Sequence, residues 1–335
     1  MYKLTLFLIL HVFVLNFLSA QKPVDKGLQS INIQSAKSFI GFLASDEMLG
    51  RDAGSHTGKI AANYLAAQLQ QMGVEPLQAS YFQPFHAVQA AELKRLSRWQ
   101  SHPDSVVAIQ SKGQYRKLSL QNVLGVLPGK NKNEYVVVGA HFDHIGTDAL
   151  WVGDSVFNGA DDNASGVSAV LQIARAFKAA GVQPERNIIF AFWDGEEKGL
   201  LGSKYFVSSF SPIKNVKSYL NFDMIGRNND EAKPKHVVFF YTAANKAFEQ
   251  WLKNDIRQYR LDLQPDYRAW DNPVGGSDNG SFAQAGIPIL WYHTDAHPDY
   301  HQPSDEPSKI NWNKLLEITK AAFLNVWKMA NEQHY

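Results

Sequence analysis

The stretch NIIFAFWDGEEKGLLGS, residues 187–203, joins an apolar run to a pair of acidic residues. The run Ile188–Trp193 is typical of a strand that is covered on both faces of a sheet. Glu196 and Glu197 follow where this strand is predicted to end, and the apolar segment after them, Gly199–Gly202, is not a solvated face. Neighbouring carboxylates can divide two tasks, because one can ligate a metal while the other carries a proton.

Alternating apolar runs and helical periods continue along the chain and predict an α/β fold. Further buried strands are expected at residues 122–127, 135–140, 219–222, 237–241 and 287–291, and helices at residues 58–72, 165–180, 246–259 and 312–330. Such alternation predicts a largely parallel sheet with helices on both faces. Residues 78–120 show no clear period and are predicted as irregular strands and loops at the periphery. With no repeat or Pro/Ser linker, residues 21–335 are predicted to form one domain.

Several residues that can bind metal stand at the predicted carboxyl ends of strands. His141, Glu196 and Asp223 each lie at or just after such an end, while Asp161 and His301 lie on loops. In open α/β sheets this edge is where binding sites are built. The residues therefore predict a metal-dependent hydrolase centre at one edge of the sheet.

Each of these residues also has a structural explanation. His141 taken alone reads as a hydrogen-bonded histidine at a strand end, although Asp143 is placed to accept its second ring N–H, as a metal-bound imidazole needs. His144 is predicted as a surface or supporting residue. Asp161 and Asp162 precede a helical run and fit a helix N-cap; both uses are compatible, because a neighbouring residue can cap while Asp161 faces a metal.

The charges and ligand types fit two divalent cations. Asp161, Glu196, Glu197 and Asp223 supply four negative charges against four positive charges. Asp223 stands between apolar neighbours, where a buried carboxylate needs a partner. Oxygen and imidazole ligands without sulfur suit zinc, and also manganese or cobalt. Two zinc ions are the prediction.

Composition and charge exclude several classes of protein. The chain has 33 Lys and Arg against 32 Asp and Glu; removing residues 1–20 takes away only Lys3 and leaves 32 of each. A neutral chain argues against a nucleic-acid partner. The absence of cysteine from the sequence excludes disulfides, thiolate ligands and a thiol nucleophile.

The first 20 residues have the features of a secretory signal. Lys3 is followed by an apolar stretch from Leu4 to Leu18 and by the small residues Ser19 and Ala20. This predicts a cleaved signal peptide at residues 1–20, export to the periplasm or the medium, and no stable membrane association afterwards. An uncleaved anchor is the alternative, but the stretch is shorter than the roughly 20 residues that span a bilayer.

Beyond these single residues, a series of motifs resembles the M28 family of metallopeptidases. The motifs cover nearly all of the chain after residue 20, in the family's order: FLASDEMLGR (42–51), NVLGVLPGK (122–130), GAHFDHIG (139–146), GADDNASG (159–166), EEKGLLGS (196–203), NFDMIGR (221–227), GSDNGSF (276–282) and HPDYHQPSD (297–305). The resemblance implies a three-layer sandwich of the zinc-exopeptidase type, with a mixed, mainly parallel sheet between helices. It also implies an aminopeptidase that acts on peptides.

The resemblance implies a role for each candidate residue. One metal is expected on His141 and Asp223, the other on Glu197 and His301, with Asp161 bridging them. Glu196 is expected to be the general base, Tyr300 a hydrogen-bond donor to the oxyanion, and Asp143 the residue that orients His141. Asp162 matches the residue that a cis peptide bond joins to the bridging aspartate.

Two departures from the family pattern and two alternative functions remain open. Asn279 stands where many relatives have histidine, and with about 60 residues between Ala79 and His141 there is no room for the protease-associated insertion of some members. Glutaminyl cyclases share the fold and the Asp-Gly-Glu-Glu sequence but use one zinc, and a non-catalytic binding protein is a second alternative. Trp270, Trp291 and Tyr292 are candidates for the substrate pocket or the core. The preferred substrate residue and the oligomeric state are not readable from the sequence.

Overall fold

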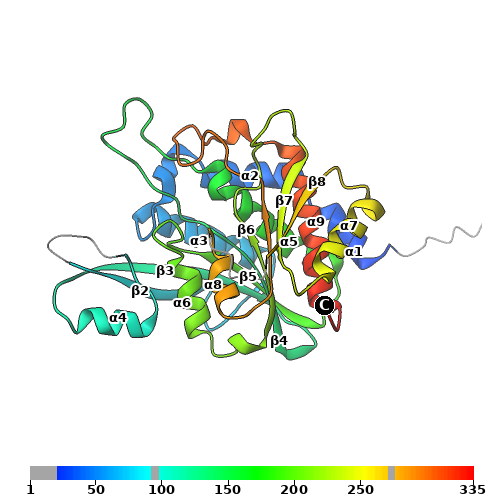
Figure 1. Cartoon of the computed structure of the whole chain (residues 1–335), viewed down its shortest axis with the longest axis horizontal. Helices are drawn as coiled ribbons and strands as arrows, with labels where there is room; N and C mark the ends of the chain where they lie inside the picture. The colour runs from blue at the N-terminus through cyan, green and yellow to red at the C-terminus, as the bar shows by residue number, and fades with distance from the viewer. Residues whose placement is uncertain (1–20, 92–97, 271–275) are drawn as a thin grey trace, which may run out of the picture.

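A computed structural model describes residues 21–91, 98–270 and 276–335, so the predicted signal peptide lies outside the described residues. Within these ranges one nine-stranded sheet runs through the molecule, in the order β1-β3-β5-β4-β6-β9-β7-β8, with β2 paired to β3 (Figure 1). The strands are β1 Glu75–Pro76, β2 Phe82–Ala90, β3 Tyr115–Leu127, β4 Asn131–His141, β5 Arg186–Trp193, β6 Val216–Phe222, β7 His236–Thr242, β8 Gln264–Trp270 and β9 Ile289–His293.

The centre of this sheet is parallel and its flanks bring in antiparallel pairs. β5, β4, β6 and β9 run parallel to one another, whereas β3 pairs antiparallel with β5 and β7 pairs antiparallel with β9. Each strand that the sequence predicts is present. Five of them have wider bounds than predicted, and β9 begins and ends two residues later than the predicted 287–291. The mixed α/β sheet is therefore confirmed.

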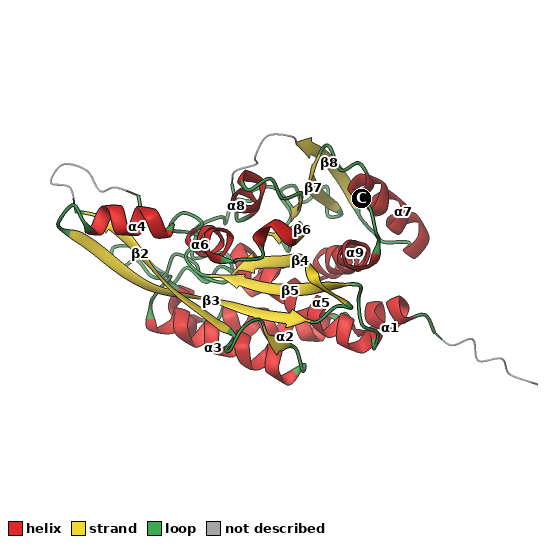
Figure 2. Ribbon diagram, turned by 90° about the horizontal axis from the view of Figure 1, so that it is seen from below, coloured by secondary structure: helices red, strands yellow, loops and turns green. Residues whose placement is uncertain are grey.

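Helices cover both faces of the sheet, as Figure 2 shows. The longer helical elements are α1 Pro23–Ser30, α2 Ile33–Leu43, α3 His56–Gln71, α4 Pro103–Gln110, α5 Gly166–Ala180, α6 Leu201–Ser209, α7 Ala247–Tyr259, α8 Asn279–Gln284 and α9 Trp312–Asn331; η1 Asp46–Arg51 is a 3₁₀ segment. The strands alternate between the two faces: in β5, Phe190 joins the core with α5 and α9, whereas Trp193 joins the core with α6 and α8. The two cores give the three layers.

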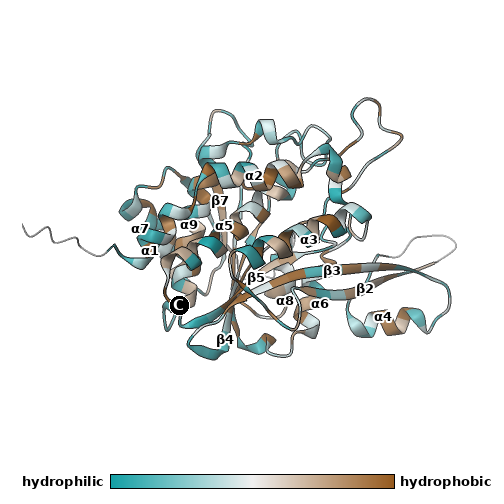
Figure 3. Ribbon diagram, turned by 180° about the vertical axis from the view of Figure 1, so that it is seen from behind, coloured by the Kyte–Doolittle hydropathy of each residue, from teal (hydrophilic) through white to brown (hydrophobic). Residues whose placement is uncertain are grey.

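The peripheral segment of the fold differs from its prediction. Residues 82–90 and 115–120, predicted as irregular strands and loops, belong to a regular antiparallel ribbon. Its register runs from Phe82 opposite Val123 to Ala90 opposite Tyr115. This ribbon and α4 extend from the body as an arm, coloured cyan in Figure 1 and seen from behind in Figure 3. The arm lies away from the main core, so its residues show little of the apolar period that predicts a buried strand.

No helix among the described residues is long and apolar enough to cross a membrane.

The parallel strands direct their carboxyl ends to one edge of the molecule. His141 ends β4, Asp223 follows β6, and the turn with Glu196 and Glu197 follows β5. The fold thus brings together residues that are distant in the sequence: His141 and Asp223, for example, are 82 positions apart.

Candidate metal centre

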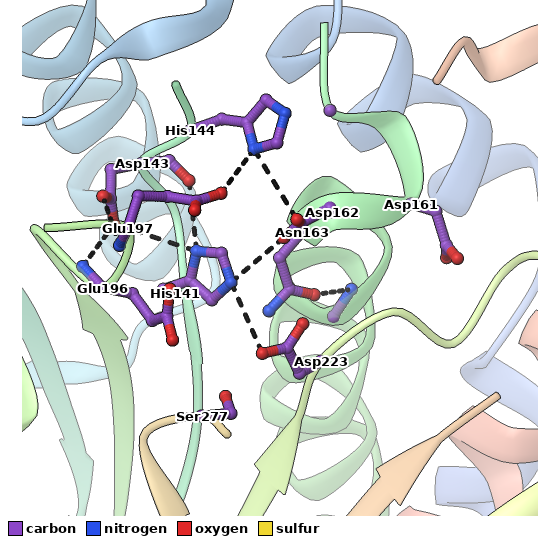
Figure 4. Close-up of polar contacts among 12 residues, drawn as sticks. His141, Asp143, His144, Asp161, Asp162, Asn163, Glu196, Glu197, Asp223 and Ser277 are labelled. Carbon is purple, nitrogen blue, oxygen red and sulfur yellow. Dashed lines mark hydrogen bonds and ion pairs between the residues drawn. The ribbon is translucent and has the colours of Figure 1, made fainter. Parts of the chain in front are cut away.

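Two groups of side chains meet at the carboxylate of Asp162 (Figure 4). In the first, His141, Asp162 and Asp223 place their nitrogen and oxygen atoms within 4.8 Å of one another. His141 Nε2 lies 3.2 Å from Asp162 Oδ1 and 3.7 Å from Asp223 Oδ2. This nitrogen is buried, and no well-formed hydrogen bond satisfies it. An imidazole nitrogen that faces two carboxylate oxygens in this way fits a shared cation.

The second group uses the other oxygen of Asp162. His301 Nε2 lies 3.2 Å from Asp162 Oδ2 and 3.1 Å from Glu197 Oε2. His144 belongs to the same cluster within 4.8 Å, and its Nδ1 lies 2.7 Å from Glu197 Oε1. With one oxygen toward each group, Asp162 has the position of a bridging ligand.

This position corrects the assignment of Asp161 as the bridge. The carboxylate of Asp161 turns away from both groups, accepts a hydrogen bond from the Gly226 N–H at 2.5 Å and lies 3.3 Å from His297. The cis peptide bond also falls one residue later than expected, between Asp162 and Asn163. Consecutive residues in this irregular segment point in different directions, so the second aspartate, rather than the first, faces the cluster.

A buried arginine and an aspartate hold the segment that carries Asp162. Arg51 has no exposed surface and donates to the carbonyls of Phe142, Gly159 and Asp162, among others. From the other side, the carboxylate of Asp305 accepts from the backbone N–H groups of Asp161 and Asp162. Ordered backbone on both sides of Asp162 fixes the direction of its side chain.

Asp143 supports the centre in a different way from the one expected. The ring Nδ1 of His141 lies 3.1 Å from the backbone carbonyl of Asp143, whereas its carboxylate is 3.8 Å away. That carboxylate accepts from the N–H groups of Glu196 and Glu197. Asp143 therefore orients His141 through its backbone and the glutamate turn through its side chain.

His144 is the residue that sequence reasoning underestimated. It is fully buried, which excludes the surface interpretation, and it bonds the ligand candidate Glu197. His144 directly follows Asp143 in the sequence, and this spacing gives no period by which to find it. Its place in the GAHFDHIG motif was the available signal.

The charges of the cluster act strongly on one another. Burial lowers the pKa of His301, but Asp162 and Glu197 outweigh this and raise it to about 10. Burial raises the pKa of Asp162, but His141 and His301 outweigh it and hold this pKa well below its ordinary value. A divalent cation replaces the proton on such an imidazole, because both compete for the same lone pair.

Glu196 differs from Glu197 in its contacts. Glu197 is grouped with His144 and His301, whereas Glu196 belongs to neither group of candidate ligands. Burial, followed by the charges of Asp223 and Asp278, raises its pKa well above the ordinary value, although His141 opposes the shift. A carboxylate with a raised pKa binds a proton more strongly than an ordinary carboxylate, as a general base requires.

A cavity of about 230 Å³ opens onto this edge of the sheet. The metal-ligand candidates His141, Asp162, Glu197, Asp223 and His301 line it together with Glu196, Met224, Gly276, Trp291, His293, Ala296 and Tyr300. The ring of Tyr300 stacks on His301 with centroids 3.9 Å apart and keeps 40% of its surface exposed.

Of the three aromatic candidates, Tyr292 and Trp270 do not line the cavity. Tyr292 faces the core and donates to Asn325, while Trp270 stands at the exposed end of β8 in contact with Phe240. Trp291 alone among the three aromatic candidates lines the cavity. Asn279 is buried at the start of α8.

Comparisons with known proteins identify a family and several relatives. A family model described as Peptidase family M28 matches residues 122–326. Leupeptin-inactivating enzyme 1 of Streptomyces exfoliatus is 35% identical over 170 residues, which is 50% of this chain and 34% of that protein. A probable leucine aminopeptidase of Arthroderma otae is 29% identical over 272 residues, 78% of this chain and 72% of that one.

Solved structures show the same fold. A zinc aminopeptidase from Bacillus subtilis superposes with a TM-score of 0.66 at 17% identity, covering 90% of this chain and 96% of that chain. The matched part of the chain spans only 34% of the length of the Streptomyces relative.

Proposed function

Because the chain belongs to peptidase family M28, we propose that it is an exported aminopeptidase with two zinc ions. The observation that carries the proposal is the shared carboxylate of Asp162, which offers one oxygen to His141 and the other to His301. The named aminopeptidases among its relatives and structural neighbours support the same activity.

The residues of the two groups would hold the metals. His141, Asp162 and Asp223 fit one ion, and Asp162, Glu197 and His301 fit the other, with His144 orienting Glu197. The donor atoms are imidazole nitrogens and carboxylate oxygens, which suit zinc. Zinc held by these residues would supply a positive charge that polarises the substrate carbonyl and lowers the pKa of water.

Glu196 is the proton carrier of the proposal. Its raised pKa and its place on the cavity wall allow it to take a proton from water and to return that proton to the leaving amine. Asp143 fixes the backbone of this residue through the Glu196 N–H at 3.0 Å.

Tyr300 is proposed to donate to the carbonyl oxygen as it gains charge. Burial, followed by the charge of Asp162, raises the pKa of its phenol, so the phenol keeps its proton at neutral pH. Its exposed position on the cavity rim leaves room for a substrate beside it.

The Glu196→Gln variant tests the proposal. We expect kcat on leucyl-anilide to fall by about 10²–10⁴-fold, because the amide cannot carry the proton. Metal content by elemental analysis stays at two zinc per chain, since Glu196 lies outside both ligand groups. Full activity in this variant contradicts the proposed role.

The same assay separates peptide hydrolysis from cyclisation. Incubation with a glutaminyl peptide followed by mass spectrometry distinguishes release of glutamine from loss of ammonia. The two ligand groups support hydrolysis, because cyclisation by the substrate's own amine needs one zinc. Cyclised product without amino-terminal cleavage refutes the aminopeptidase.

Export is proposed from the signal-like residues 1–20. Expression of the full chain followed by cell fractionation and amino-terminal sequencing tests it. We expect a mature chain that begins at Gln21 outside the cytoplasm; an uncleaved chain in the membrane fraction contradicts cleavage.

A further inference from the structure

A second cavity lies between α6 and α8, with lining residues different from those of the cavity at the proposed centre. It has a volume of about 330 Å³, and α6 contributes Lys204, Val207 and Ser208 to its wall. Ser281, Gln284 and Ala285 line it from α8 and the residue after it, and Gln100, Ser101 and His102 from the segment that enters α4. Figure 1 shows α6 and α8 next to each other beside the arm. The Ser101 hydroxyl donates to the Leu201 carbonyl at 2.7 Å, which fixes this segment against α6.

Hydrogen bonds connect one wall of this cavity to the turn of Glu196. The Gly199 N–H donates to the Glu196 carbonyl at 2.7 Å, and Lys204 Nζ donates to the Gly199 carbonyl at 2.8 Å. On the other wall, Ser281 follows Asp278 by three residues, and Asp278 is one of the charges that act on Glu196. The ammonium group of Lys204 is therefore held over the turn that begins at Glu196.

The lining of this cavity differs in charge from the acidic centre around Glu196. Among the described lining residues of this cavity there is no aspartate or glutamate, while Lys204 and His102 are present. Gln100 is shared with an adjoining cavity whose described lining residues include Arg98 and Lys112 and again no acidic residue. Burial and then Arg98 lower the pKa of Lys204, although the charges of Asp278 and Glu196 oppose this shift, so an anion close to Lys204 favours its charged form.

The position of the leaving part of the peptide relates this cavity to the substrate. If Glu196 returns its proton to the leaving amine, the departing part of the peptide begins beside Glu196 and extends from there. Each residue of an extended peptide reaches up to about 3.5 Å. An ammonium group has three N–H donors, and the Gly199 carbonyl uses one of those on Lys204.

We propose that the cavity between α6 and α8 binds the C-terminal carboxylate of short peptide substrates, with Lys204 as its cationic partner. This inference rests on the aminopeptidase function proposed above. Recognition of this carboxylate would make the enzyme selective for short peptides with a free C-terminus. Lys204 is a specificity residue here and has no part in the bond cleavage.

The test compares peptides that differ only in the charge at their C-terminus. Leu-Ala, Leu-Ala-Ala and Leu-Ala-Ala-Ala are each offered as the free acid and as the C-terminal amide. We expect the wild type to favour the free acid by about tenfold in kcat/KM at the length that reaches Lys204, as for a charge-assisted contact. In Lys204→Gln this preference disappears through a higher KM for the free acid, with kcat changed little.

Lys178→Gln is the matched control. Lys178 is also an exposed lysine whose Nζ donates to a glycine carbonyl, that of Gly73 at 2.8 Å, but it lies on α5, across the sheet from α6. We expect this variant to keep the wild-type preference. Equal rates for acids and amides at every length in the wild type overturn the inference, as does an equal loss for both in Lys204→Gln.

Two further results separate this inference from the function on which it rests. If the peptides are cleaved but Leu-Ala-Glu-amide competes as well as the free acids, the cavity takes side-chain carboxylates and the proposed terminal recognition is wrong. If no peptide is cleaved by the zinc-loaded wild type, the aminopeptidase function itself is refuted, and this site with it.

Discussion

The two adjacent aspartates, Asp161 and Asp162, have separate environments although they share one chemistry. Asp162 faces three histidines, His141, His144 and His301, whereas Asp161 bonds the backbone of Gly226. A carboxylate that accepts from a backbone N–H contributes to stability, and one between two cations contributes to metal affinity. The pair therefore permits a direct comparison.

Replacing each aspartate by asparagine is expected to give different results. Asp162→Asn removes the charge that both groups share, so bound zinc falls below two per chain and kcat/KM falls by at least about 100-fold. Asp161→Asn retains an oxygen for the Gly226 N–H, so we expect two zinc ions and a loss of about 1 kcal/mol in the free energy of unfolding. Elemental analysis and denaturant unfolding measure both. Loss of zinc from Asp161→Asn with full zinc in Asp162→Asn contradicts the corrected assignment.

At the residue scale, the sequence predicted which segments supply metal ligands better than it predicted which way each side chain points. His141, Glu197, Asp223 and His301 lie together as expected, because strand ends of a parallel sheet converge on one edge. The direction of Asp161 was wrong because residues 160–165 form an irregular turn with no regular period. No spacing rule decides which of two consecutive aspartates faces a site in such a turn.

Among the elements, α9 carries a buried lysine in its first turn. Lys314 is 3% exposed, and its Nζ donates to the Arg227 carbonyl at 2.5 Å. Burial lowers its pKa to about 8, although the charge of Asp161 opposes this shift. A cation at a helix N-terminus also meets the positive end of the helix dipole. The charge of Lys314 therefore costs stability in the folded state.

The pH dependence of unfolding reports this cost. Between about pH 8 and pH 10.5 the unfolded chain holds a proton on Lys314 that the folded chain has released, so the stability of the wild type rises with pH in this window. Relative to Lys314→Met, the unfolding free energy of the wild type is expected to rise by roughly 2–3 kcal/mol from pH 8 to pH 10. Urea unfolding of both proteins at each pH measures this difference. A constant difference across the window shows that Lys314 keeps its ordinary pKa.

Elements were predictable where burial gives a simple pattern. The central strands β4, β5 and β6 are covered on both faces and read as apolar runs. β8 was missed because it is a partly exposed edge strand with proline and aspartate in QPDYRAW, residue types that are rare in strands. The arm was missed because it lies outside the main core.

At the scale of the whole molecule, the proposed metals connect segments that are distant in the sequence. Their ligand candidates follow β4, β5 and β6 or lie on the loops before α5 and after β9. Four carboxylates lie close together there, those of Asp162, Glu196, Glu197 and Asp223. Cations at their centre replace mutual repulsion by attraction, and they bind the folded chain alone.

Removal of the metals is therefore expected to weaken the entire fold. A ligand present at about a thousand times its Kd stabilises the folded state by about 4 kcal/mol, so chelation by EDTA is expected to lower Tm by roughly 5–10 °C in a domain of this size. Because one sheet carries every segment of the site, the melting curve keeps a single transition. Asp162→Asn is the control, since it has already lost the shared ligand and its Tm responds little to EDTA. A wild-type Tm that chelation leaves unchanged contradicts a metal centre at Asp162, and readdition of zinc restores the higher Tm if the centre is as proposed.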